Sequence, residues 1–105
     1  MKDLEEKILL IEILGCLEAL KKKVVSIDEM EKFIFSPRVI KELREKRCNE
    51  TIISIIEQGC ELEDYNSLIP ERLERRITEM KEMVEVCISG YQEYSQTFWR
   101  GSETD

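Results

Sequence analysis

Carboxylates concentrate in one short stretch of the chain, residues 55–71, between two apolar segments. A dense acidic stretch beside an aromatic side chain attracts a basic protein surface and offers that surface an aromatic contact. We therefore predict a docking surface for a basic partner, formed by Glu57, Glu61, Glu63, Asp64 and Tyr65. The alternative is a solvated connection whose carboxylates lie near the N-terminal dipole of the following helix. The sequence leaves both interpretations open.

Two pairs of carboxylates have a spacing that could hold a magnesium ion. Glu42 and Glu45 are three residues apart, and so are Glu61 and Asp64. Residues three apart share a helix face, and hard cations prefer oxygen ligands. The pairs resemble the Glu-x-x-Glu and Glu-x-x-Asp pairs of all-α nucleotide pyrophosphohydrolases. That resemblance implies a magnesium-dependent enzyme that releases pyrophosphate from nucleotides, although 23 acidic residues in 105 produce such pairs easily by chance.

Histidine is absent from the chain, which excludes Ser-His and Cys-His nucleophile pairs and histidine-based zinc sites. The four glycines are isolated, so the sequence has no glycine-rich phosphate loop. Four cysteines lie far apart without a Cys-x-x-Cys pair: Cys16, Cys48, Cys60 and Cys87. We predict that these thiols behave as small buried hydrophobic groups. We also predict a protein that is not an enzyme and has no cofactor.

The net charge of −7 at pH 7 determines which partners the protein attracts. A negative protein repels nucleic acids and anionic membrane surfaces and attracts basic proteins. We therefore predict a basic protein partner, no nucleic acid and no membrane. The longest apolar run, residues 8–17, is interrupted by Glu12 and is shorter than the ~20 residues that span a bilayer. Because no secretory signal pattern is present, we expect a cytoplasmic protein.

Residues 2–25 carry apolar side chains at helical spacing around more than half of the helix circumference. This pattern predicts a long first helix that other helices cover on several sides. Gly15 lies in its middle, where glycine costs about 1 kcal/mol of helix propensity relative to alanine. A close crossing of another helix would explain a glycine there, and we predict one.

Polar residues with capping chemistry mark the starts of three shorter helices. Ser26 and Glu29 form a capping box. Ser36 precedes a proline, the residue tolerated best at the first helical position. Asn49 precedes an isoleucine-rich segment that we predict to be helical, with Gly59 as its C-cap.

A second long helix is predicted over residues 70–89, after an acidic loop in which Asn66 and Ser67 suit a turn. Residues 91–99 continue this helix or dock through Phe98 and Trp99, and residues 100–105 form a frayed end. The predicted fold is therefore an all-α, small single-domain bundle over residues 1–105. It has about five helices, and its first and last helices are long.

Three segments within residues 9–77 resemble small uncharacterised cytosolic proteins of Gram-positive bacteria. They are "LLIEILGCLEALKK", "VVSIDEMEKFIFSP" and "IISIIEQGCELEDYNSLIPERLERRI". The resemblance assigns no activity and no functional residue. Proteins of this kind include immunity partners that bind and block a toxin, so we expect a non-enzymatic inhibitor of a basic toxin. The magnesium-dependent enzyme remains one alternative. A structural homodimer that buries the aromatic C-terminus is another.

Overall fold

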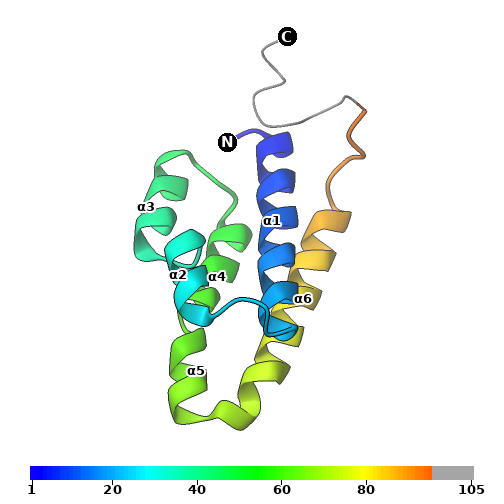
Figure 1. Ribbon diagram of the computed structural model, residues 1–105. Helices are drawn as coiled ribbons and strands as arrows, with labels where there is room; N and C mark the ends of the chain where they lie inside the picture. The colour runs from blue at the N-terminus through cyan, green and yellow to red at the C-terminus, as the bar shows by residue number, and fades with distance from the viewer. Residues whose placement is uncertain (96–105) are drawn as a thin grey trace.

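The computed structural model describes residues 1–95, and every regular element in that range is helical (Figure 1). The elements are α1 Asp3–Lys21, α2 Ile27–Phe33, α3 Pro37–Glu45, α4 Glu50–Gly59, α5 Leu62–Leu68, the 3-10 turn η1 Pro70–Arg72 and α6 Leu73–Ser89. The predicted all-α class with long first and last helices is confirmed.

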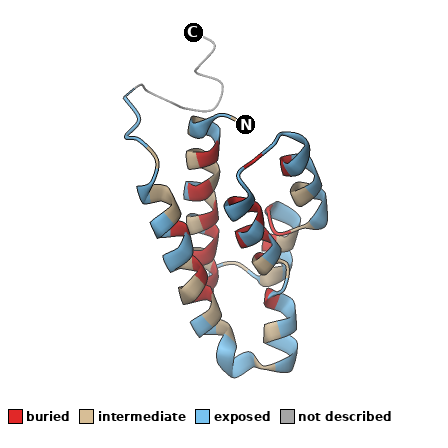
Figure 2. Ribbon diagram, turned by 180° about the vertical axis from the view of Figure 1, so that it is seen from behind, coloured by how far each residue is buried: buried red, intermediate tan, exposed pale blue. Residues whose placement is uncertain are grey.

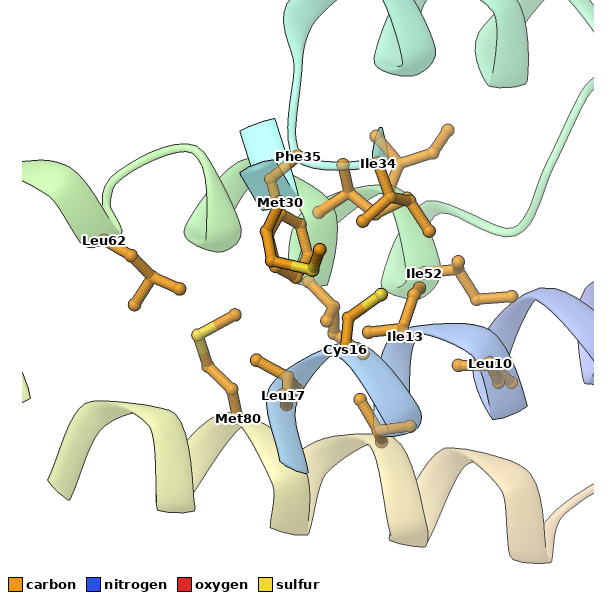
Figure 3. Close-up of a cluster of buried hydrophobic side chains, with 14 of the residues drawn as sticks. Leu10, Ile13, Cys16, Leu17, Met30, Ile34, Phe35, Ile52, Leu62 and Met80 are labelled. Carbon is orange, nitrogen blue, oxygen red and sulfur yellow. The ribbon is translucent and has the colours of Figure 1, made fainter. Parts of the chain in front are cut away.

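α1 is the central helix of the bundle. α6 packs along α1 and also against α4, α4 packs against α3, and α2 packs against α5 (Figure 1). α5 and η1 form one end of the molecule and lead the chain from α4 into α6. Buried residues run along the length of α1 and gather on α4 (Figure 2). Figure 3 shows Leu17 of α1, Phe35, Leu62 and Met80 of α6 among the side chains that form this core.

The predicted caps form as expected. The Ser26 hydroxyl accepts from the Glu29 backbone N–H at 3.0 Å, and the Glu29 carboxylate accepts from the Ser26 N–H at 3.0 Å. Ser36 accepts from the backbone N–H of Val39 at 3.3 Å. Asn49 accepts from the N–H of Thr51 at 2.8 Å. These local hydrogen bonds fix where α2, α3 and α4 begin.

The two helical glycines have roles that differ from the predicted ones. Gly15 is exposed, and a Cβ added to it would meet nothing within 4 Å, so the predicted close crossing at this residue is wrong. The close approach occurs at Gly59, which is buried under the ring of Phe35. Gly59 is the last residue of α4, and Cys60 occupies the C-cap position. The space that Phe35 needs therefore explains this glycine better than capping does.

The predicted acidic loop before Pro70 is wrong, because residues Leu62–Leu68 form α5. Glu63 and Asp64 lie in the first turn of this helix, where carboxylates favour the helix dipole. Leu62 is fully buried and anchors the helix to the core. The acidic residues therefore begin their own helix. The next helix follows only after η1, so α6 starts at Leu73 instead of Pro70.

α6 ends at Ser89, so the predicted continuation of the helix through Tyr91 and Tyr94 does not occur. Tyr91 follows the helix and packs against the core as a partly buried side chain. The predicted roles of Phe98, Trp99 and residues 100–105 lie outside the described residues.

A buried carboxylate connects the two ends of the described chain to the middle. Glu6 of α1 is only 6% exposed. Its Oε2 accepts from the backbone N–H of Asn49 at 2.8 Å, and its Oε1 accepts from the Tyr91 hydroxyl at 2.8 Å. Because both oxygens have partners, the side chain is buried without an unsatisfied acceptor. Glu6 therefore fixes the start of α4 and the segment after α6 against α1.

Candidate functional site

The acidic residues predicted to bind a partner lie around the junction of α4 and α5. Glu61 is the N-cap residue of α5, and Glu63 and Asp64 occupy its first turn. All three are exposed, and none forms an ion pair within residues 1–95. Glu63 accepts a hydrogen bond from the Ser67 hydroxyl at 3.2 Å. The three carboxylates are therefore available to a cationic surface.

Glu57 lies one turn before this group, on α4, and it is partly neutralised. Its Oε2 is 3.2 Å from Nη2 of Arg44, which is also 3.7 Å from Oε1 of Glu50. All three side chains are well exposed, so water and salt weaken these pairs. A cationic partner can replace Arg44 at Glu57 with a small loss of free energy.

The tertiary fold adds a carboxylate that the sequence analysis missed. The pKa of the Cys60 thiol is raised first by burial and then by the negative charges of Glu31, Glu57 and Glu61. These carboxylates come from α2, α4 and the start of α5. These carboxylates therefore lie near enough to Cys60 for their charges to act on the same thiol. No local sequence signal identifies Glu31, because its place there depends on the packing of α2 against α5.

We call this region the acidic surface and define it by Glu31, Glu57, Glu61, Glu63 and Asp64. Tyr65, the aromatic member of the predicted set, has a different environment. Its side chain is half-buried, and the guanidinium carbon of Arg76 lies 5.8 Å from the centroid of its ring. Tyr65 therefore contacts α6. Of the predicted set, the carboxylates are the groups exposed to a partner.

The predicted magnesium ligands do not come together. Glu42 and Glu45 are exposed on α3, and Oε1 of Glu42 lies 3.8 Å from Nζ of Lys46. Within residues 1–95, no three or more acidic or cysteine side chains are grouped closely enough to hold a metal ion. Glu61 and Asp64 consequently do not join the α3 pair in a four-carboxylate site.

The cysteines contribute to packing. Cys16 and Cys48 are buried, as predicted, whereas Cys60 and Cys87 are partly exposed, and all four are free thiols. Burial raises the pKa of Cys16 and of Cys48 to about 11, with smaller contributions from Glu12 and Glu6 respectively. Thiols with raised pKa values are weak nucleophiles at neutral pH, because the thiolate is the reactive form.

The fold and the surface together define a small all-α protein with a negatively charged face built from three helical segments. None of the helices in the described range has the length and apolar character required to cross a membrane.

The chain belongs to DUF3969, a family of proteins of unknown function, whose sequence profile matches residues 1–100. The expected membership of an uncharacterised family is confirmed. No curated protein and no solved structure matches the chain.

Proposed function

We propose that this protein is a non-enzymatic binding module that docks a basic protein on its acidic surface. The observation that supports this proposal is the convergence of Glu31, Glu57 and Glu61 around Cys60. Glu63 and Asp64 extend the same charge along α5. Of these five carboxylates, only Glu57 has an ion-pair partner within residues 1–95.

Helices hold these carboxylates, which reduces the cost of ordering the site when a partner binds. Pre-organised groups lose less conformational freedom on association. A negative surface on a protein with a net charge of −7 also accelerates encounter with a positively charged partner. This acceleration falls as salt increases, because the Debye length is only about 10 Å at 0.1 M ionic strength. Binding is therefore expected to depend strongly on salt.

A cytoplasmic inhibitor of a basic toxin is the specific form of this function that we propose. An inhibitor needs a stable scaffold and a complementary surface, and it needs no catalytic group. The acidic surface supplies such complementarity to a toxin with a basic active site or nucleic-acid-binding face. The magnesium-dependent alternative receives no support, because Glu42 and Glu45 do not form a metal-holding group with Glu61 and Asp64 in the described residues.

The test is affinity capture of the tagged protein at low salt, followed by binding measurements with each co-purifying protein. The double substitution Glu61→Lys with Asp64→Lys reverses two exposed charges of the acidic surface. Glu82→Lys with Glu85→Lys is the matched control, since both residues are exposed on α6 and neither forms an ion pair within residues 1–95.

We expect a basic partner that salt releases and whose affinity falls about tenfold or more with the acidic-surface variant, because opposed like charges cost several kcal/mol at an interface. The control variant should bind with nearly unchanged affinity. Equal losses with both variants would indicate an effect of net charge alone and would contradict the site. Recovery of the tagged protein alone at every salt concentration would count against the binding function itself.

A further inference from the structure

A second charged site lies between α5 and α6 and has the opposite sign. A cavity of about 300 Å³ is lined by Tyr65, Arg72, Arg75, Arg76 and Glu79, and we call it the arginine pocket. Three arginines and one glutamate line it, in a chain whose net charge is −7. Its lining comes from α5, η1 and the first turns of α6. A cluster of positive side chains in a protein of negative net charge is more readily explained by a ligand than by solubility.

Arg76 is held firmly at this pocket. Its guanidinium lies over the ring of Tyr65, it donates to Oε1 of Gln58, and its Nη1 is 3.5 Å from Oε1 of Glu79. Only 20% of its side chain is exposed. The Nε–H is buried and has no hydrogen-bond partner within residues 1–95. A buried donor without a partner costs about 1–3 kcal/mol. Because this Nε is shielded from solvent, only the exposed fifth of the Arg76 side chain can reach a ligand in the pocket.

Arg72 and Arg75 supply further guanidinium N–H donors, and few of these donors are paired with other groups of the protein. Arg75 is 84% exposed, and its Nε lies 3.6 Å from Oε2 of Glu79, a weak pair in water. Arg72 is exposed and has no ion pair within residues 1–95. One anchored guanidinium and two exposed ones can therefore approach a single ligand from different sides.

We propose that the arginine pocket binds a phosphate group, either as inorganic phosphate or as a phosphate monoester. Guanidinium presents two parallel N–H donors that match the oxygens of phosphate, and charge-assisted hydrogen bonds of this kind are stronger than neutral ones. A dianion balances the positive charge that Glu79 leaves uncompensated. Tyr65 adds an aromatic ring at the edge of the cavity, which offers a contact to the organic part of a monoester.

The phosphate site is independent of the acidic surface, because no residue belongs to both. The test is an NMR titration of the ¹⁵N-labelled protein at low ionic strength with inorganic phosphate, phenyl phosphate and benzoate. Saturable shifts are expected at the amides of residue 65 and residues 72–76. Phenyl phosphate should bind at least about tenfold more tightly than the monoanion benzoate, since charge-assisted hydrogen bonds are the stronger ones.

The double substitution Arg72→Glu with Arg75→Glu should weaken phosphate binding about tenfold or more. Both side chains are exposed, so circular dichroism should show an unchanged helix content. Arg38→Glu on α3 is the control, because it also reverses an exposed arginine but lies outside the pocket.

Tighter binding of phenyl phosphate than of inorganic phosphate would assign the site to monoesters, and equal binding would assign it to free phosphate. Shifts that do not saturate would overturn the proposal. So would shifts of equal size at Lys21–Lys23, or an equal loss of binding with Arg38→Glu, because each indicates general attraction of anions to positive charge.

Discussion

Gly59 leaves no room for a side chain, because the ring of Phe35 occupies the position where a Cβ would be. A Cβ built on Gly59 would lie 2.5 Å from Cγ of Phe35, a separation that real Cβ atoms essentially never show. Phe35 is 2% exposed, and Gly59 is buried at the end of α4. This contact joins the segment after α2 to the segment before α5. It therefore determines how closely the shorter helices approach each other.

Gly59→Ala is expected to destabilise the protein by about 1–3 kcal/mol, since an added methyl group in a packed core displaces its neighbours. The measurement is urea unfolding followed by circular dichroism. Gly15→Ala is the matched control, because Gly15 is also helical but has open space around it. That substitution should stabilise the protein by about 0.5–1 kcal/mol through helix propensity. Equal effects of the two substitutions would show that Phe35 does not constrain Gly59.

Tyr91→Phe is expected to reduce stability by about 1–2 kcal/mol at pH 8, because it removes the hydrogen bond from the Tyr91 hydroxyl to Glu6. Burial, and then the hydrogen bond to Glu6, hold the pKa of Tyr91 above its ordinary value. The unfolded chain releases this proton first, at about pH 10, so the stabilisation is complete below that pH and decreases as the pH rises further.

The stability difference between the natural protein and Tyr91→Phe should therefore shrink between pH 8 and pH 11. Urea unfolding at both pH values measures it. Other groups that titrate in this range are common to both proteins and largely cancel in the comparison. A difference that stays constant with pH would mean that the phenol proton does not contribute to stability through Glu6.

Thiol labelling of the native protein at pH 8 should separate the cysteines into two classes. Cys16 and Cys48 are buried, with pKa values raised to about 11, so they should react far more slowly with iodoacetamide than Cys60 and Cys87. Mass spectrometry of tryptic peptides gives the order. In denaturant all four should react at similar rates. Rapid native labelling of Cys16 would contradict the packing of the face of α1 that meets the core.

Local sequence signals predicted the starts of α2, α3 and α4 correctly, because a cap involves residues only two or three positions apart. Ser26, Ser36 and Asn49 each make the predicted capping interaction with a backbone N–H. The same reasoning failed before Pro70, where the acidic residues suggested a loop. The burial of Leu62 stabilises a helix there, and burial depends on neighbours that are remote in sequence.

The candidate sites show a similar division. The sequence predicted Glu57, Glu61, Glu63 and Asp64 as an acidic cluster, because these residues are close together along the chain. It did not predict Glu31, which comes from another helix. It also placed Tyr65 with the carboxylates, although the side chain contacts Arg76 on α6. Whether a side chain on a short helix is exposed or packed depends on which face of that helix the rest of the core covers.

The sequence by itself determined the all-α class, the long terminal helices, the caps and the negative charge, since composition, periodicity and spacing depend on neighbouring residues. Only the tertiary structure decided that Gly59 rather than Gly15 is the point of close approach. It also decided that Glu6 is buried and that three arginines and Tyr65 line one cavity. These features depend on the distances between helices, which arise when the whole core packs at once.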